Sequence, residues 1–445
     1  MQYKVFGCKV NKYYTDKWLN SEYLSDKSGT FVASCVVTDS AKRKWVRFVK
    51  KEVEILDSEQ KVYISWCGAF KDWKAQDDFF DLYPSLAGFQ EKIEVLDEAP
   101  QENSAEVSLR AEEIKRDESS KSTTKIDLSK LKKLQNSSIY TRKYLLIQWG
   151  CDSYCTFCLT VQKRGRHYYR SSEDIIDEIL EYEQEWGKEV VLTWVNLSAW
   201  GLQNTHETKN FSQSLEKNGQ KWQGSQFAKL LEAILENTSI PRIRISSLGP
   251  EFVDDAVLKI LGNTRIYPHF HFSIQSGSTD VLRSMARHYD WAYMRDLLQK
   301  TQDIKRDDGV SISIWADLIV WFPWETEEDF TDTYKLVKDF NITKVHAFPF
   351  SAHTMWESVP AGKFKNQVSD EIKKQRMQEL MTLADTVRSD FLASEKWKRF
   401  QVLVEKVRGD TFSGWTENYI EANETNFRLE SGTLQRNNII QWILI

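Results

Sequence analysis

The chain has 445 residues, of which 41% are hydrophobic, and a formal net charge of −5. A chain of this length usually exceeds one hydrophobic core, so we expect two or three domains. The small negative charge excludes a uniformly basic nucleic-acid-binding surface, and any RNA contact must therefore use local patches. No apolar run approaches the length of a membrane span and the chain starts without a signal-peptide pattern, which predicts a cytoplasmic protein with no membrane partner.

Three cysteines follow short apolar segments near the start of the chain. The segments read as strands at 3–6, 30–33 and 61–64, with helical patterns between them at 15–24 and 40–54. This alternation predicts a Rossmann-like parallel sheet over residues 1–96, with the strand ends meeting at one edge. The cysteines at that edge are Cys8, Cys35 and Cys67. Their spacing alone fits both a metal-binding triad and ordinary buried cysteines.

Residues 97–138 change in character. They are rich in Ser, Lys and Glu and have no sustained apolar periodicity. Such a composition cannot bury enough apolar surface to fold, so we expect a flexible charged linker that marks the first domain boundary.

Strand-like and helix-like segments alternate after the linker. The expected strands are 144–148, 190–193, 243–246, 269–274, 312–320 and 344–348, and the expected helices are 172–185, 227–236, 252–261 and 327–340. Six such repeats predict a parallel sheet whose right-handed crossovers curl it toward a barrel, over a domain at 139–394. The polar stretch 204–224 has no place in this pattern and is expected to be a surface insertion.

Three further cysteines directly follow the first strand of this series. Cys151, Cys155 and Cys158 have the spacing C-x-x-x-C-x-x-C. Three thiolates on a loop at the carboxyl end of a strand can hold a four-iron cluster and leave one iron open for a small ligand. A structural zinc site normally takes four ligands, and no fourth Cys or His lies nearby in sequence. A disulfide framework would be out of place in a chain without a secretory signal.

These cysteines resemble those of a known enzyme family. The second triad, with Phe157 before its last Cys, is similar to the motif of radical S-adenosylmethionine (SAM) enzymes. The start of the chain resembles the signature of the methylthiotransferases in Gly7-Cys8-Lys9-Val10-Asn11, in 34–41 and in Cys67-Gly68. The resemblance implies two [4Fe-4S] clusters, one on each triad, with SAM as cofactor and an open six-stranded partial barrel. The G-C-K-V-N stretch resembles the branch that acts on threonylcarbamoyladenosine in tRNA.

The family pattern also suggests roles for residues at other strand ends. Residues 269–278 resemble the family's H-x-H-x-x-x-Q-S-G-S segment, with His269 and His271 as supporting residues, and 285–287 resemble its M-x-R. The resemblance implies catalytic roles for Gln275, Ser276 and Arg287, and SAM contacts for Phe157, Asn196, Ser273 and Gln275. Phe157 also fits a hydrophobic plug. Arg287 fits a ligand of the SAM carboxylate or of an RNA phosphate, and equally a solvated surface group.

A basic cluster follows the second triad. Arg164, Arg166 and Arg170 lie just after the cysteine loop. They fit contacts to the tRNA backbone and, equally well, ordinary surface charge.

Several tryptophans stand where the family pattern has glycine. The chain has 17 Trp, and its 18 Gly make up about 4% of the residues, against roughly 7% in average chains. The positions are Trp66, Trp194, Trp321, Trp324 and, less securely aligned, Trp356. Strand-end turns use glycine for positive φ or close backbone approach, which an indole side chain hinders. Because some bacterial lineages read UGA as glycine, we hypothesise that the natural protein has glycine at these sites.

The last fifty residues form a third expected unit at 395–445. Strand-like runs at 400–405, 416–421 and 439–444 predict a small antiparallel barrel. This segment resembles the TRAM domain, an RNA-binding barrel. From residue 396 onward the chain has seven Lys and Arg and six Asp and Glu, so this unit is not strongly basic. A module that docks on another part of the protein is therefore an alternative to RNA binding.

The resemblance implies a radical reaction on tRNA. SAM is cleaved by one electron, the resulting radical removes hydrogen from an adenine carbon, and a methylated sulfur from the auxiliary cluster fills the position. The implied partners are the anticodon region of tRNA and an electron donor of the flavodoxin or ferredoxin type, and we expect a monomer. The alternatives are another tRNA adenosine, an aspartate of a ribosomal protein, and a non-catalytic iron–sulfur RNA-binding protein.

Overall fold

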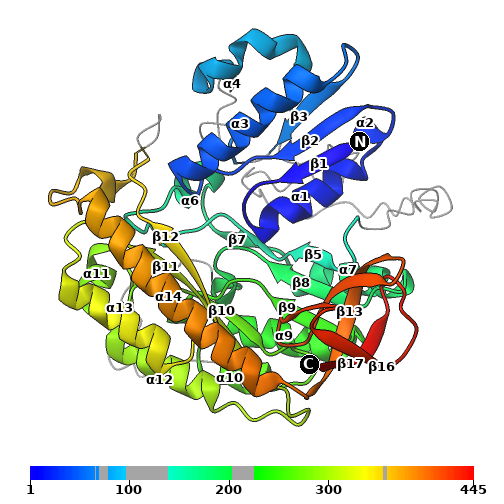
Figure 1. Ribbon diagram of the computed structural model, residues 1–445, viewed down its shortest axis with the longest axis vertical. Coiled ribbons are helices and arrows are strands. Elements are labelled where there is room, and N and C mark those ends of the chain that lie inside the picture. Colours follow the sequence, from blue (N-terminus) through cyan, green and yellow to red (C-terminus); the bar gives the residue numbers. More distant parts are fainter. Residues whose placement is uncertain (66, 70–78, 97–138, 203–224, 354–357) are drawn as a thin grey trace, which may run out of the picture.

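The computed structural model describes residues 1–65, 67–69, 79–96, 139–202, 225–353 and 358–445 (Figure 1). The expected linker at 97–138, the expected insertion at 204–224, Trp66 and Trp356 lie outside these residues. In the part of the chain that is described, no helix is long and apolar enough to cross a membrane.

The amino-terminal part is a parallel sheet, as predicted. Its strands are β1 (Gln2–Val5), β2 (Gly29–Ala33), β3 (Lys61–Ser65) and β4 (Ile93–Val95), in the order β1-β2-β3-β4. Its helical elements are α1 (Lys9–Leu19), α2 (Glu22–Ser25), α3 (Asp39–Ile55), α4 (Phe79–Leu82) and η1 (Pro84–Lys92). Helix α3 repeats apolar residues every four positions, and buries Trp45, Val49 and Val53 against β2 and β3. Strand β4, which the sequence pattern did not indicate, completes the sheet.

The central part contains the six expected parallel strands. They are β5 (Lys143–Leu146), β8 (Glu189–Thr193), β9 (Arg242–Ile245), β10 (His269–Gln275), β11 (Ser313–Val320) and β12 (Lys344–Pro349). They form two sheets, β5-β8-β9 and β10-β11-β12. Leu248 joins the sheets, because its N–H donates to the His271 carbonyl at 2.8 Å and its carbonyl accepts from Ser273 N–H at 2.9 Å. In the described ranges β12 does not pair with β5, so the series stays open there. Helix α1 packs against β5 at this opening.

Helices cover the outside of these strands (Figure 1). They are α6 (Thr160–Arg164), α7 (Ser172–Gln184), α9 (Gln226–Asn237), α10 (Asp255–Leu261), α11 (Thr279–Ser284), α12 (Trp291–Gln302), α13 (Glu327–Asp339) and α14 (Asp370–Glu395). Short elements are β6 (Gln148–Trp149), β7 (Tyr168–Tyr169), η3 (Leu197–Ala199), η5 (Pro250–Phe252) and η6 (Pro360–Lys363). Several helices start at a Ser, Thr or Asp whose side-chain oxygen accepts a hydrogen bond from a backbone N–H of the first turn. These caps include Ser171, Ser225, Asp254, Ser278, Asp290 and Thr326.

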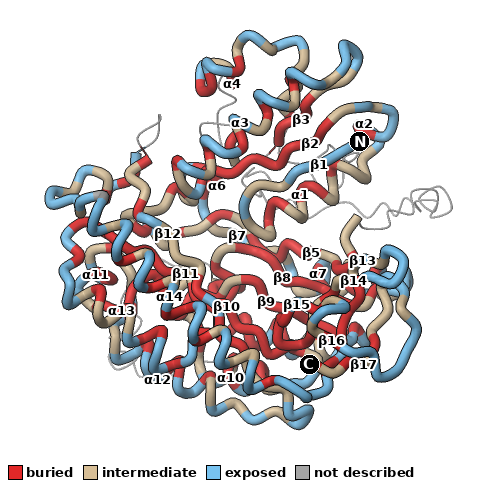
Figure 2. Tube along the Cα trace, in the orientation of Figure 1, coloured by how far each residue is buried: buried red, intermediate tan, exposed pale blue. Residues whose placement is uncertain are grey.

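The main hydrophobic core lies between the strands and these helices. Figure 2 shows β5, β8, β9, β10 and β11 as almost continuously buried, whereas β12 is partly exposed and the covering helices are exposed on their outer faces. The apolar runs of the sequence explain this, because strands covered on both sides bury every residue. Leu192, Ile243, Phe270 and Phe272 are all fully buried in this core.

The carboxyl-terminal part is a five-stranded antiparallel sheet. Its strands are β13 (Arg399–Arg408), β14 (Thr411–Trp415), β15 (Glu421–Asn423), β16 (Phe427–Ser431) and β17 (Ile439–Leu444), in the order β15-β14-β13-β17-β16. The strands expected at 400–405 and 439–444 are confirmed. The strand expected at 416–421 is wrong, because most of that segment is a turn. Tyr419 has a left-handed φ of +65°, and the Thr416 hydroxyl accepts the Ile420 N–H at 2.8 Å, which bends the chain back.

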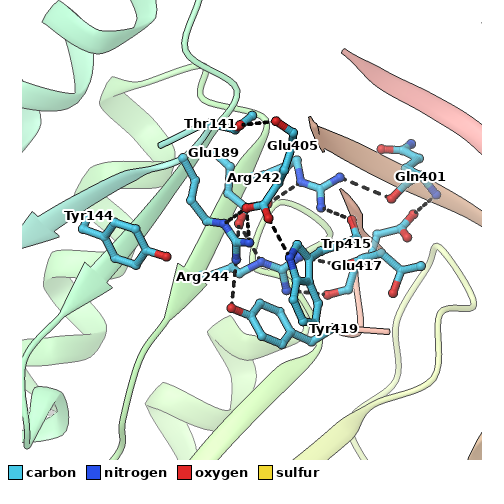
Figure 3. A network of polar contacts seen from close by, with 12 residues as sticks. Thr141, Tyr144, Glu189, Arg242, Arg244, Gln401, Glu405, Trp415, Glu417 and Tyr419 are labelled. Atoms are coloured by element: carbon cyan, nitrogen blue, oxygen red, sulfur yellow. Dashed lines mark hydrogen bonds and ion pairs between the residues drawn. The ribbon is translucent and has the colours of Figure 1, made fainter. Parts of the chain in front are cut away.

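This turn docks on the starts of β8 and β9 through buried charges (Figure 3). Both Glu189 carboxylate oxygens accept hydrogen bonds at 2.7 Å, one from Arg242 and one from Arg244. The remaining guanidinium N–H groups reach backbone carbonyls of the carboxyl-terminal sheet. Arg242 donates to Trp415 at 3.0 Å, and Arg244 donates to Glu417 at 2.9 Å. The carboxyl-terminal sheet is therefore fastened to the central strands through main-chain atoms.

Tryptophan occupies left-handed backbone at four described positions. They are Trp186 (φ +62°), Trp321 (φ +68°), Trp324 (φ +71°) and Trp397 (φ +66°), and only eight other non-glycine residues share that region. A bulky residue there costs roughly 1–2 kcal/mol, which glycine avoids. The expected strained turns are therefore confirmed at Trp321 and Trp324. Trp194 is different, because its φ is not left-handed and its 2%-exposed indole instead fills interior space.

Trp186 and Trp397 were missed by the sequence analysis. Each stands two residues after the last residue of a helix, α7 and α14 respectively. This is the position where helices commonly end on a left-handed glycine. Both indoles are exposed, at 77% and 68%, so packing does not explain their presence.

We predict that the natural protein has glycine at six positions, encoded by UGA. They are the four securely aligned positions proposed from sequence, Trp66, Trp194, Trp321 and Trp324, together with Trp186 and Trp397. Peptide mass spectrometry of the protein purified from its own cells measures this directly. Trp291, which starts helix α12 with ordinary backbone, is the control and should be read as Trp. Tryptophan at all six sites would refute the idea.

The Glu189 network should dominate the stability of the fold. Burial opposes ionisation of Glu189, but the charges of Arg244, Arg242 and Arg142 outweigh it and lower its pKa to about 2. Because the folded pKa lies below the unfolded value, the stabilisation is complete above about pH 4.5 and is lost as pH falls toward 2. We expect Glu189→Gln to cost about 3–5 kcal/mol, since it leaves buried guanidinium groups without a counter-charge.

Denaturant unfolding at neutral pH measures this loss. Asp280→Asn is the matched control, because it breaks the exposed pair with Arg283 and should change stability little. An equal, small effect of the two substitutions would contradict the role given to Glu189.

Candidate functional site

The second cysteine triad lies on the loop between β6 and α6. Gly150, with φ +62°, starts this loop. A Cβ on Gly150 would lie 1.8 Å from the Arg166 carbonyl oxygen, so only glycine allows the two ends of the loop to approach. The loop is also held at its centre, where Thr156 N–H donates to the Met285 carbonyl at 3.1 Å and Thr156 carbonyl accepts from Ala361 N–H at 2.9 Å.

The three thiols of this loop act on one another electrostatically. Burial and the neighbouring thiolates raise the pKa of Cys151 to about 12, and burial and Cys158 raise the pKa of Cys155. All six cysteines are free thiols. Three unpaired thiols on one short loop are a donor set that fits an iron–sulfur cluster, whose positive charge would favour the thiolates.

Arg287 contacts this triad directly. Its Nη1 donates to Cys155 Sγ at 3.3 Å, and its Nη2 forms an ion pair with Glu251 at 3.0 Å. Its other N–H groups reach the Ser273 carbonyl and the Tyr289 hydroxyl. The side chain is therefore buried and each guanidinium nitrogen has a partner, so Arg287 is not a solvated surface group. Its catalytic role and a contact to the SAM carboxylate or an RNA phosphate stay predictions.

The first triad is assembled by the ends of β1, β2 and β3. Cys8 caps helix α1, and Cys35 and Cys67 follow β2 and β3. Gly7, with φ +105°, lies so close that a Cβ would be 2.8 Å from Cys35 Sγ. Burial, together with the charges of Cys8 and Cys67, raises the pKa of Cys35 to about 12. Three free thiols at neighbouring strand ends fit a second cluster.

Arg164 connects the two triads. It ends helix α6, just after the second triad, and its Nη2 lies 3.0 Å from Cys67 Sγ and 4.0 Å from Cys8 Sγ. Its guanidinium also lies 5.0 Å from the ring of Trp194, whose Nε1 donates to the Gly150 carbonyl at 2.6 Å. Arg164 thus follows the second triad in the sequence and contacts the first triad in space.

The expected basic surface cluster is largely wrong. Arg164 is buried against the first triad, where its guanidinium group contacts the sulfur atoms of Cys67 and Cys8. Arg170 is bound by Glu178 at 2.7 Å and by the Leu146 carbonyl at 2.9 Å. Only Arg166 of the three is exposed. Neither RNA contact nor simple surface charge therefore describes Arg164 and Arg170.

The other predicted site residues lie at strand ends. Asn196, after β8, accepts the Ser198 hydroxyl at 3.1 Å, and Ser273 faces the Ser247 hydroxyl at 3.3 Å. Gln275 ends β10 with a left-handed φ of +73°. Ser276 is fully buried, and its hydroxyl lies 3.3 Å from the hydroxyl of Thr333 on α13. Catalytic roles of Gln275 and Ser276 stay predictions. SAM contacts of Asn196, Ser273 and Gln275 stay predictions.

Phe157 packs on the apolar side of the cysteine loop. It lies against a cluster that includes Leu159, Met285, Phe322 and Phe350. This packing agrees with the interpretation of Phe157 as a hydrophobic plug. A contact with the SAM adenine stays a prediction.

A polar group inside the strands was missed. Asp317 Oδ1 lies 2.9 Å from His271 Nε2 and 3.3 Å from His346 Nδ1, and these three side chains could in principle share a metal ion. Lys9 acts electrostatically on the same carboxylate, which opposes a further cation. The H-x-H stretch was the one signal in the sequence that indicated this group. The register of β11 and β12, which pairs Asp317 with His346, could not be read from the sequence.

His269 lies below this group. It is 1% exposed, stacked 4.4 Å from the ring of Tyr419 and edge-on to Trp315 at 4.4 Å. Burial lowers its pKa well below the usual value, so it is a neutral packing residue.

Known proteins resemble this chain along much of its length. The sequence pattern of the Radical SAM superfamily matches residues 145–337. The threonylcarbamoyladenosine tRNA methylthiotransferase MtaB of Bacillus subtilis (strain 168) is 31% identical over 63% of this chain and 58% of its own length. The tRNA-2-methylthio-N(6)-dimethylallyladenosine synthase of the same organism is 30% identical over 65% of this chain and 53% of its own length. The chain thus spans little more than half of these two relatives.

Other matches extend further. The MtaB protein of Thermotoga maritima (strain ATCC 43589 / DSM 3109 / JCM 10099 / NBRC 100826 / MSB8) is 29% identical over 94% of this chain and 89% of its own length. Among solved structures, the radical SAM methyltransferase TsrM of Kitasatospora setae, with cobalamin and a [4Fe-4S] cluster bound, matches with 12% identity and a TM-score of 0.43. That match covers 78% of this chain and 72% of the other.

Two convergent triads predict about eight irons per chain after anaerobic reconstitution, from four in each cluster. Replacing Cys151, Cys155 and Cys158 together by Ala should leave about half, and so should replacing Cys8, Cys35 and Cys67. Iron and sulfide analysis measures this. Saturation of the wild-type protein at four irons would contradict the predicted auxiliary cluster.

Proposed function

Because the chain belongs to the radical SAM methylthiotransferase family, we propose that it adds a methylthio group to an adenosine of tRNA, namely N6-threonylcarbamoyladenosine beside the anticodon. The observation that carries the proposal is the pair of cysteine triads. Arg164 follows one triad in sequence and contacts the other in space. A reaction that activates a carbon at one cluster and delivers sulfur from another requires this proximity.

The residues of the chain supply the arrangement for this chemistry. When bound, SAM and the clusters provide the one-electron chemistry that opens an unreactive C–H bond, and the sulfur that replaces the hydrogen. Arg287 and Glu251 fix Cys155 relative to β10. Arg164 places a positive charge on the first triad, which stabilises negative charge on its sulfur atoms. The buried cores around both loops exclude water.

The substrate assignment rests on the amino-terminal motif and on relatives. Gly7 to Asn11 resemble the threonylcarbamoyladenosine branch, and MtaB proteins of three further organisms also match. Matches named as dimethylallyladenosine synthases have similar identities, so a neutral tRNA adenosine is the second candidate.

The carboxyl-terminal sheet is proposed to bind RNA as a TRAM-like unit. Lys406 and Arg408 are exposed and share one face of β13, and Arg428 is exposed on β16. Because this sheet is fastened to the central strands, a tRNA held there would be fixed relative to both triads. We also propose cytoplasmic location, a monomer, and an electron donor of the flavodoxin or ferredoxin type.

Nucleoside analysis of tRNA from a strain that lacks the gene tests this function. We expect the 2-methylthio form of threonylcarbamoyladenosine to disappear and its precursor to accumulate. Complementation with the wild-type gene should restore the product, whereas a Cys151→Ala gene should not. A ribosomal-protein aspartate as the only modified target would contradict the proposal. Unchanged nucleosides and proteins would favour the non-catalytic alternative.

A further inference from the structure

Lys9 is a partly buried cation that stands next to the first triad in the sequence. It is the first residue of α1 and directly follows Cys8. Its Nζ lies 5.8 Å from the centroid of the Tyr419 ring, which belongs to the docked turn of the carboxyl-terminal sheet. The side chain therefore extends from the triad toward the space between β11 and that turn.

The ammonium group of Lys9 has no direct anionic partner. Within the described ranges no hydrogen bond or ion pair holds it; the Tyr419 ring contacts it, and the carboxylate of Asp317 acts on it through space. Lys12, one turn further along α1, differs because it donates to the Tyr144 hydroxyl at 3.0 Å. A cation–π contact at this distance stabilises by roughly 0.5–1 kcal/mol, which is less than the cost of enclosing an unpaired charge.

The charges around Lys9 favour an anion. Those that act on it most strongly are the cations Arg142, Arg244 and Lys12 and the carboxylate of Asp317. Asp317 is already held by His271 and His346. The enclosed region is therefore rich in positive charge, and a bound carboxylate would relieve it.

The proposed substrate carries such a group. On threonylcarbamoyladenosine the substituent at N6 ends in a carboxylate, the only anionic group of the modified base. The target carbon C2 and the substituted carbon C6 are both bonded to N1, so they lie on one edge of the base. A residue that holds the substituent therefore also restricts where C2 lies in the site.

We propose that Lys9 binds the carboxylate of the threonylcarbamoyl group and makes this chain select an adenosine with an anionic N6 substituent. This inference rests on the proposed function and deepens it. Lys9 is a specificity-determining residue, and its neighbours Arg142 and Arg244 contribute long-range attraction while they stay engaged in the Glu189 network.

Lys9→Met tests the inference, because Met keeps the length and helix propensity of Lys and removes the charge. The substrates are two anticodon stem-loop RNAs, one with threonylcarbamoyladenosine and one with its carboxylate methyl ester. Wild type should prefer the acid, in kcat/KM for methylthio product, by about 30-fold or more, as expected for a buried charge pair. Lys9→Met should lose this preference, and Lys9→Arg should retain most of it. Iron content is measured for each variant, so that loss of a cluster is distinguished from loss of the preference.

Lys17→Met, at the other end of α1, is the matched control and should keep the wild-type preference. A Lys9→Met variant with the wild-type preference, or with equal losses on both RNAs, would overturn the inference and leave the proposed function intact. Wild type inactive on both RNAs would instead refute the proposed function.

Discussion

The buried carboxylate of Glu189 holds the molecule together at the amino ends of the central strands. It binds Arg242 and Arg244, and these groups extend to main-chain carbonyls of the carboxyl-terminal sheet (Figure 3). Enclosing these charges is tolerable only because each guanidinium is fully hydrogen-bonded. The turn that they hold contains Tyr419, which stacks on His269 and contacts Lys9. One charge network thus connects the amino-terminal helix, the central strands and the last sheet.

A buried arginine contacts each of the two cysteine triads. Arg287 contacts Cys155, and Arg164 contacts Cys67, so each triad has one buried guanidinium group beside it. Because burial disfavours thiolates, these positive charges help each site to hold anionic sulfur ligands. Arg164 stands within two turns of Cys158 but serves the other triad. The separation of the two sites is therefore set by one short helix, α6.

The sequence allowed the strands and both triads to be predicted, because apolar runs and cysteine spacing are local signals. It did not allow the burial and the contacts of the arginines to be predicted. Arg164 and Arg170 have the same local appearance as surface charge, and only tertiary contacts distinguish them. The segment 416–421 was misread as a strand because its pattern suits one, whereas Arg244 binds its carbonyls in a turn. Trp186 and Trp397 were missed because their left-handed φ becomes visible only in the folded backbone.

That the two triads hold clusters facing one interior is tested most directly by electron paramagnetic resonance of the reduced, reconstituted protein. Wild type is compared with two variants, each with one triad changed to alanine. We predict that the wild-type spectrum shows magnetic coupling between the clusters, seen as broadening or splitting that neither variant shows. A wild-type spectrum equal to the sum of the two variant spectra would contradict the arrangement.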